Sequence, residues 1–562
     1  MKKSILASSI AAAVFSLGAV TGAQAAEALS ATTGSTNYGI GDVLLVPYFS
    51  AQAENATLLS LINTDTQSGK AVKVRFRGAA NSDDVFDFQV FLSPRDVWTA
   101  NIAKGADGLA RLTTSDNSCT KPSAAVLNAT PFQTGRLNTA LTGDALANGT
   151  REGYIEIIGM ADVPPHNRSS GPASAFTGLL GTASTDAAVV AGTKLTTDSA
   201  LFTAIKHVSG VAPCTGTAFT NLDTTSAFAL TNSAAGTGPA LGLTPSTGGL
   251  MANWTIVNTV NAAAYGGEAI ALSSSEAYSN RVAAGSNVNI IYAPQIGTAT
   301  GVNIVTNWSA DPLFLAAASG TNYYNLTTQA LTTTVGTAPV FAAGYYDLPD
   351  LSTPLDTPIT AANAAAQVTA ITSAFSQRPS IVNEFAVESA ISGSTDWVFS
   401  MPTRRYSVAM AYSKITATDD GRRWNSLLNS QDGTVKNQFQ LSNTSIVNGL
   451  ICVSGANPAP NDREERSVTS TPVVVVSPST VAGSVKLCGE TSVLSFNQGA
   501  ATTSASLKAN VALTNIDVTY SAGWATMSVS AGTGNGNYPV AGGVFQRAQF
   551  GAQGFGIFRP FR

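Results

Sequence analysis

Alternating apolar and polar positions in the first third of the chain predict β-strands. Residues 72–77 alternate apolar side chains with basic ones such as Arg75 and Arg77, and residues 86–92 alternate apolar side chains with polar ones such as Asp87. A period of two is typical of antiparallel strands that cover one side of a core. We therefore predict that the two runs pair, with the basic face opposite the acidic face and with both polar faces in water.

Strand-like patterns recur along the rest of the chain, whereas helical patterns are few. Apolar residues at i, i+4 and i+7 predict a helix near 197–208. A second helix is predicted at 357–375, where Thr357 can cap the helix and Pro358 can open its first turn, and a shorter one at Asp311. Further strands are predicted at 58–64, 154–158, 254–258, 302–305, 397–399, 473–476, 493–496 and 511–529. This distribution favours a mainly β fold, a multi-domain β-sandwich of immunoglobulin-like or related type with a few short helices and long loops.

The domain organisation follows from changes in composition along the chain. Ala, Thr, Ser and Gly dominate between about 169 and 249, where charges become rare. We predict an N-terminal β-sandwich domain at 26–165, an Ala/Thr/Gly-rich middle region with strands and a helix at 166–380, and a C-terminal β-rich domain at 381–562.

The first 25 residues have the layout of a secretory signal peptide. Lys2 and Lys3 give a positive start, an apolar run follows from Ile5 to Val20, and Ala23-Gln24-Ala25 supplies a small-residue cleavage pattern. We predict export and cleavage after Ala25. No other stretch has 18 consecutive apolar residues, so we expect no transmembrane helix in the mature chain.

Export gives the four cysteines a specific interpretation. Cys119, Cys214, Cys452 and Cys488 form an even set, which favours two disulfides in an oxidising compartment. Three connectivities are possible, and proximity along the chain favours Cys119–Cys214 and Cys452–Cys488. No pair has the C-x-x-C spacing of a zinc site, so metal binding by these cysteines is the weaker interpretation.

Composition narrows the possible function classes. Charged residues make up 11% of the 562 residues, hydrophobic residues 44%, and the formal net charge is −4. Low charge with substantial apolar content argues against a disordered chain. The absence of a basic excess argues against a nucleic-acid partner, and two histidines leave little basis for a histidine metal site.

A search for catalytic motifs returns none, so we predict a non-enzymatic protein without a catalytic residue or a resident cofactor. The sequence lacks G-x-S-x-G, H-E-x-x-H, a phosphate-binding loop and a dinucleotide fingerprint. A serine-hydrolase triad would have to use His166, in a turn-rich loop, or His207, on the predicted helix. A secreted hydrolase therefore remains only as the second alternative.

Two kinds of polar cluster are candidate ligand sites. Paired loop acids can hold Ca²⁺, although such pairs also form ordinary turns. Two arginine pairs could bind phosphates or acidic sugars, because guanidinium forks suit such anions, with pairing to nearby acids such as Asp419 as the alternative. The calcium candidates are Asp83-Asp84, Asp419-Asp420 and Asp347/Asp350, and the anion candidates are Arg404, Arg405, Arg422 and Arg423.

The last twenty residues are rich in aromatic side chains and glycine. Phe545, Phe550, Phe555 and Phe558 alternate with small and polar residues before the chain ends at Arg562. This pattern predicts a buried final strand, or an exposed apolar patch that docks a neighbouring copy. The aromatic belts of outer-membrane barrels are the rival interpretation, which long irregular stretches between the strands disfavour.

The overall profile resembles that of bacterial S-layer and related exported cell-surface proteins of Gram-negative type. Segments 92–98 (LSPRDVW) and 395–406 (TDWVFSMPTRRY) also look like segments of such proteins. The resemblance implies a structural protein that self-associates into a coat, with Ca²⁺ as a possible aid and lipopolysaccharide or another outer-membrane component as a possible anchor. An adhesin or glycan-binding protein is the first alternative, for which exposed aromatic side chains would be the discriminating feature.

Overall fold

The computed structural model describes most of two β-rich regions of the chain. The described residues are 39–138, 140–165, 199–223, 228–229, 242–243, 246–260, 262–272, 291–292, 323–325, 330–332, 372–410, 412, 415–424, 438–455, 458–462, 485–498, 503–518, 520–551 and 553–561. The predicted signal peptide, His166, Asp347, Asp350, the helix expected at Asp311 and the strands expected at 302–305 and 473–476 lie outside these residues.

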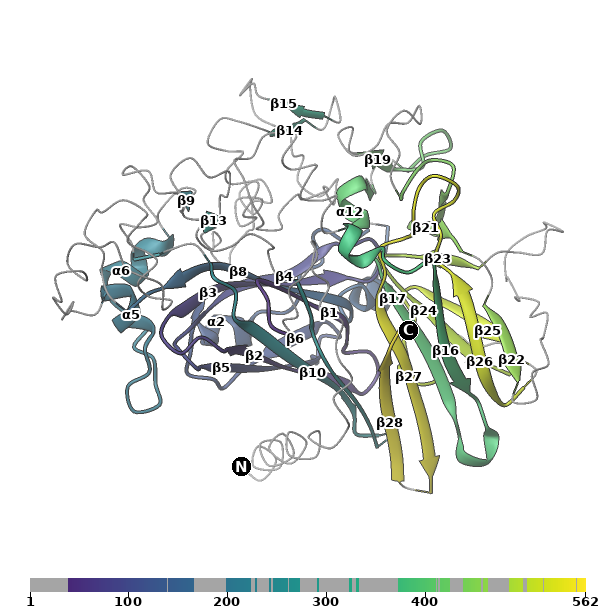
Figure 1. The fold of residues 1–562 in the computed structure, drawn as a ribbon, viewed down its shortest axis with the longest axis horizontal. Helices are drawn as coiled ribbons and strands as arrows, with labels where there is room; N and C mark the ends of the chain where they lie inside the picture. The colour runs from purple at the N-terminus through teal and green to yellow at the C-terminus, as the bar shows by residue number, and fades with distance from the viewer. Residues whose placement is uncertain are drawn as a thin grey trace.

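An N-terminal sandwich is formed by two antiparallel sheets that face each other across one core (Figure 1). The first sheet has the order β12-β1-β8-β3-β4-β7 and the second has the order β11-β10-β2-β5-β6. The strands are β1 (Val43–Ser50), β2 (Asn55–Asn63), β3 (Gly69–Gly78), β4 (Asp84–Leu92), β5 (Val97–Lys104), β6 (Ala110–Thr113), β7 (Cys119–Lys121), β8 (Glu152–Val163), β10 (Leu250–Asn258), β11 (Ala263–Glu268) and β12 (Ile270–Leu272).

A C-terminal sandwich lies beside the first, drawn in green and yellow in Figure 1. A five-stranded sheet, β25-β24-β17-β27-β28, faces a three-stranded sheet, β16-β26-β22, and a further sheet has the order β20-β21-β23. The strands are β16 (Ser380–Ala386), β17 (Ser394–Ser400), β20 (Thr444–Val447), β21 (Leu450–Ser454), β22 (Ala459–Asp462), β23 (Lys486–Cys488), β24 (Thr491–Asn497), β25 (Leu513–Asp517), β26 (Ala522–Ser528), β27 (Ala541–Phe550) and β28 (Gln553–Pro560). The pairing of β24 with β25 is parallel, and the other pairings within these sheets are antiparallel.

The remaining described elements are short. Two-stranded ladders join β9 (Phe228–Ala229) to β13 (Ile291–Tyr292), β14 (Tyr323–Asn325) to β15 (Ala330–Thr332), and β18 (Val408–Met410) to β19 (Arg422–Trp424). The helices are α2 (Ala124–Ala129), α3 (Gly143–Asn148), α5 (Ala200–Ile205), α6 (Thr217–Thr220) and α12 (Arg404–Ser407), with 3₁₀ turns η2 (Asn221–Asp223) and η5 (Ser389–Ile391). In the described part of the chain, no helix has the length and apolar character that crossing a membrane requires.

These elements confirm the mainly β fold class and the sandwich architecture. The helix predicted near 197–208 is α5, and the Ser199 hydroxyl caps it by accepting a hydrogen bond from the Phe202 amide at 3.0 Å. Of the helix predicted at 357–375, the structure describes 372–375, which are helical. Strands β10, β11 and β12 come from the range predicted as a separate middle region, yet they complete the N-terminal sheets, because strand pairing readily joins segments that are distant in sequence.

The core of the N-terminal sandwich extends across the junction into the C-terminal sandwich, which also has a core cluster of its own. Val398, Leu507 and Phe545 of the C-terminal sandwich belong to the same buried cluster as the core of the N-terminal one. The Phe545 ring lies 5.9 Å from the rings of Tyr48 and Trp254, centroid to centroid. Apolar side chains at this junction therefore hold the two sandwiches together.

The strand pair predicted from alternation is present, but the expected exposure of its polar faces is wrong. Strand β3 pairs with β4 in antiparallel register, with Arg75 opposite Asp87, and Lys73 forms an ion pair with Asp87. Lys73, Arg75 and Arg77 are nevertheless buried. Alternation distinguishes the two faces of a strand, but it does not show that a second layer of protein covers the polar face.

Candidate functional site

Arg404, one of the predicted anion-binding residues, lies in the interior at the start of α12. Its Nη2 atom is 2.7 Å from Glu490 Oε2. The two groups form an ion pair, but their orientation does not make this contact a hydrogen bond. Its Nη1 atom donates hydrogen bonds to the carbonyl oxygens of Ile451 at 2.6 Å and Gly489 at 2.9 Å. Both Arg404 and Glu490 are fully buried, so this guanidinium serves internal groups.

Arg405, its neighbour on α12, crosses the junction between the sandwiches. Its Nη2 atom is 2.8 Å from Glu156 Oε1 on β8. Glu156 Oε2 is also 3.2 Å from Arg75 Nη2 and 3.3 Å from Arg77 Nε, so three arginines surround one buried carboxylate. Placing these charges together compensates part of the cost of removing each from water.

The second predicted arginine pair occupies a different place. Arg422 on β19 has Nε 2.8 Å from Asp420 Oδ2, and its Nη1 donates to the Thr444 hydroxyl at 2.8 Å. These partners differ from those of Arg404 and Arg405, so Arg422 is not part of the group of arginines that contacts Glu156 and Glu490. The side chain of Arg423 lies outside the described residues, and anion binding by the four arginines stays a prediction.

The acids considered as calcium ligands have other partners where the structure describes them. Asp83 is buried and accepts a hydrogen bond from the Tyr412 hydroxyl at 2.7 Å, and burial raises its pKa to about 7. Asp84 Oδ2 lies 4.0 Å from Arg77 Nη1, and Asp420 forms an ion pair with Arg422. Among the described residues, no group of three or more acidic, histidine or cysteine side chains is arranged to hold a metal ion.

A further acid, Glu152, links the two sandwiches. Its Oε1 accepts a hydrogen bond from the Asn510 amide at 3.1 Å, and its Oε2 accepts one from the Tyr48 hydroxyl at 3.1 Å. Burial raises the pKa of Glu152 to about 6. Sequence reasoning did not single out Glu152, Glu156 or Glu490, because nothing near them in sequence marks an acid that will be buried between domains.

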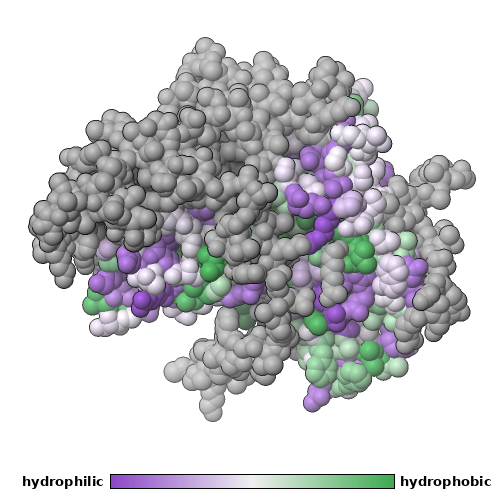
Figure 2. Space-filling view, in the orientation of Figure 1, coloured by the Kyte–Doolittle hydropathy of each residue, from purple (hydrophilic) through white to green (hydrophobic). Residues whose placement is uncertain are grey.

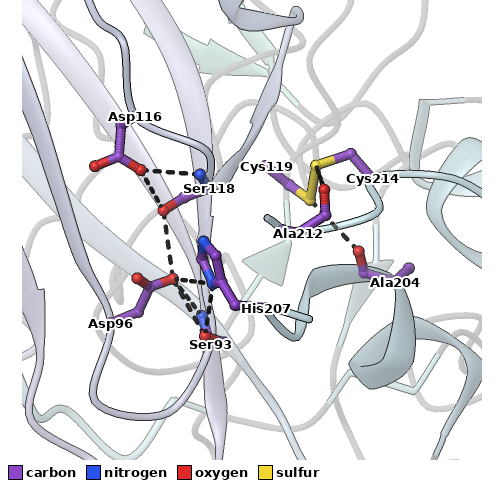
Figure 3. The surroundings of a disulfide bond; sticks show 9 residues. All are labelled: Ser93, Asp96, Asp116, Ser118, Cys119, Ala204, His207, Ala212 and Cys214. Carbon is purple, nitrogen blue, oxygen red and sulfur yellow. Dashed lines mark hydrogen bonds and ion pairs between the residues drawn. A yellow bond between two sulfur atoms is a disulfide. The ribbon is translucent and has the colours of Figure 1, made fainter. Parts of the chain in front are cut away.

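Both predicted disulfides are present, and the structure gives each a clear mechanical role. Cys119 on edge strand β7 bonds to Cys214, which ties the segment 199–223 to the first sheet (Figure 3). Cys452 and Cys488 face each other on neighbouring strands β21 and β23 and are also bonded. Two disulfides are typical of a protein that folds in an oxidising compartment.

A serine, a histidine and an aspartate meet beside the first disulfide, at the position considered for a hydrolase triad (Figure 3). Ser93 Oγ is 3.2 Å from His207 Nδ1, and Asp96 Oδ2 is 3.4 Å from the same ring nitrogen. A catalytic relay needs the acid on one ring nitrogen and the serine on the other. The Ser93 amide and hydroxyl also donate hydrogen bonds to Asp96 Oδ2. The cluster is therefore a hydrogen-bond network that links the segment after α5 to the turn before β5.

The C-terminal hairpin is the candidate interaction site. Strands β27 and β28 extend beyond the rest of the C-terminal sandwich at the bottom of Figure 1, and Figure 2 shows hydrophobic residues gathered in that area. On the face that continues from the sandwich core, Phe550, Phe555 and Ile557 are 55%, 58% and 41% exposed. We call these three residues the hairpin surface.

The opposite face of the hairpin packs on the N-terminal sandwich. The Phe558 ring lies 4.9 Å from the Trp254 ring, and Gly556 fits where a Cβ atom would come within 2.5 Å of the Ala264 carbonyl oxygen. Glycine on one face and Phe555 and Ile557 on the other thus follow from the alternation along β28. The final strand β28 therefore has one partly buried face and one exposed apolar face, so the fully buried strand that the sequence offered as one interpretation is wrong.

A second exposed apolar area lies on the outer face of the three-stranded sheet. Val382 on β16 and Trp524 on β26 point away from the core, and Trp524 is 46% exposed. Glu384 of β16 is in register with Trp524 and forms an ion pair at 2.8 Å with Arg559, which lies on the same face of β28 as Ile557. No family model, curated protein or solved structure matches the chain.

Proposed function

We propose that the chain is an exported, non-enzymatic structural protein of the bacterial cell surface that assembles with copies of itself into a coat such as an S-layer. The observation that supports this most is the hairpin surface, where two phenylalanines and an isoleucine remain exposed on an ordered strand pair. Contiguous apolar side chains on a folded surface mark an interaction site. The resemblance noted in the sequence, and the two disulfides, support the proposed location.

A second copy of the chain is the partner that this surface fits best. Strand β28 ends its sheet, pairs among the described strands with β27 alone, and carries no charged residue from Gln553 to Phe558. Natural sheets protect such edges with charges or proline, because an open edge pairs readily with another strand. Two copies related by a twofold axis could align their β28 edges in antiparallel register and bury both hairpin surfaces together.

The size of the surface predicts a weak single contact. A large apolar side chain has roughly 200 Å² of surface, so the exposed fractions of the three residues amount to about 300 Å² of apolar surface per copy. A stable interface buries about 800 Å² per partner. Backbone pairing along β28 and a second contact, for which the area around Val382 and Trp524 is suited, would therefore both be needed for an extended coat.

Sedimentation velocity of the secreted chain over a range of concentrations tests this proposal. We expect association with a dissociation constant in the micromolar range, which corresponds to a binding free energy of about −8 kcal/mol. The double variant Phe550→Asp/Phe555→Asp should weaken it by about a hundredfold, because two carboxylates would be buried in an apolar contact. Leu441→Asp, at a residue that is 52% exposed on the turn before β20, is the matched control and should associate like the wild type. Equal association of all three proteins would overturn the proposal.

A glycan-binding surface protein is the second candidate, and exposed Trp524 favours it. Its ring lies on β26 in register with Glu384, so an apolar face and a hydrogen-bonding carboxylate are neighbours, as sugar recognition requires. Titration with cell-surface oligosaccharides, followed by tryptophan fluorescence, tests this candidate. Binding that is lost in Trp524→Ala and retained in Phe555→Asp would favour it over self-assembly.

A further inference from the structure

Arg547 on β27 has an unusual environment for an arginine in this chain. It lies opposite Gly556 on one side and Ser394 of β17 on the other. Its Nε and Nη1 atoms are buried without a hydrogen-bond partner, and no carboxylate among the described residues forms an ion pair with it. Buried donors of this kind are rare in folded proteins, and an ion or water that completes them is the usual explanation.

A second cation lies close to Arg547. Lys508 belongs to the loop 503–510, which Asp396 of β17 holds by accepting hydrogen bonds from the amides of Ser506 at 3.0 Å and Leu507 at 2.7 Å. The Ser506 hydroxyl is also 2.8 Å from the Ser394 hydroxyl, on the strand position that pairs with Arg547. The loop therefore brings Lys508 to the same face of the sheet as Arg547.

The electrostatics agree with this placement. Burial, and then the charge of Arg547, lower the pKa of the Lys508 ammonium. Asp396 acts in the opposite direction, but it is fully buried, burial raises its pKa, and its Oδ2 atom is occupied by the loop amides. Arginines elsewhere in the described chain have a carboxylate partner, for example Arg559 with Glu384 and Arg111 with Asp107.

We propose that Arg547 and Lys508 form a binding site for a phosphate group at the junction of the hairpin, the 503–510 loop and β11. A guanidinium fork offers parallel donors to two phosphate oxygens, and an ammonium adds a point charge. The two positive charges match a phosphate dianion, and the hydroxyls of Ser394 and Ser506 lie beside them. This site is on the face of the hairpin opposite the hairpin surface, so it does not depend on self-assembly.

Calorimetric titration of the full secreted chain with inorganic phosphate, at constant ionic strength set with chloride, tests the site. Binding should weaken about tenfold in Arg547→Gln and in Lys508→Gln, and less in Arg547→Lys, which keeps the charge but loses the fork. Arg111→Gln, at an arginine that is already paired, is the control and should bind like the wild type. Lys508→Gln changes a half-buried loop residue, so it tests the site even if the Arg547 variants fold poorly.

Flotation with phosphatidic acid vesicles, compared with phosphatidylcholine vesicles, identifies the source of the phosphate group. Binding to phosphatidic acid that requires Arg547 assigns the site to a lipid headgroup, whereas binding to inorganic phosphate alone assigns it to a free anion. The proposal is overturned if chloride alone reproduces the heat, or if the Arg547 and Lys508 variants bind both probes like the wild type.

Discussion

Replacing Arg404 with methionine would leave the Glu490 carboxylate buried without its cation. Both side chains are fully buried, and the guanidinium also satisfies the carbonyl oxygens of Ile451 and Gly489. Breaking a buried pair by removing one partner costs about 3–5 kcal/mol, mostly because the remaining charge has no compensation. The exposed pair between Arg111 and Asp107 provides the contrast, since Arg111→Met should cost less than about 1 kcal/mol.

Urea unfolding with both disulfides intact measures this difference. Tryptophan fluorescence follows unfolding, and the apolar contacts across the junction predict a single transition for both sandwiches. Glu490→Gln in the Arg404→Met background should recover part of the loss, because the neutral amide removes the uncompensated charge. A loss below about 1 kcal/mol in Arg404→Met, or strictly additive effects in the double variant, would refute this reasoning.

Three further predictions concern the junction and the first disulfide. The pKa of Asp83 is raised to about 7 in the folded chain, so the free energy of unfolding falls as the pH rises from about 4 to about 7, by at most about 1.4 kcal/mol per pH unit. Chemical unfolding should therefore show Asp83→Asn gaining stability relative to the wild type across that range. A stability difference between the two proteins that stays constant with pH would contradict this prediction. Cys119→Ser/Cys214→Ser opens a loop of 95 residues and should lower the free energy of unfolding by about 4–5 kcal/mol. Proteolysis within 199–223 should become faster, and an unchanged rate of proteolysis would argue that the disulfide does not hold this segment. Phe545→Ala leaves a cavity at the junction of the two sandwiches and should cost about 3–5 kcal/mol, with two unfolding transitions in place of one. A single unshifted transition would contradict the coupling of the two sandwiches.

Local patterns predicted what depends on neighbouring residues. The alternation at 72–77 and 86–92 predicted strands β3 and β4 and their charge pairing, and the cysteine spacing favoured the two disulfides that are present. The strands depend on backbone periodicity and the disulfide pairing follows the order of the cysteines along the chain, both of which a single sequence displays directly.

Contacts between distant segments were beyond such patterns. Arg405 meets Glu156 across 249 residues, and no local signal marks a glutamate that will lie under another domain. The same limit explains the hairpin. Alternation places Phe555 and Phe558 on opposite faces of β28, but the packing of β11 against β28 decides which of the two is the less exposed.

Electron microscopy of the purified chain, with and without a calcium chelator, tests whether the protein assembles into a coat. We predict ordered two-dimensional arrays for the wild type and for Leu441→Asp, and dispersed particles for Phe550→Asp/Phe555→Asp. Single particles for the wild type at every concentration, confirmed as monomers by sedimentation, would contradict a self-assembling coat protein.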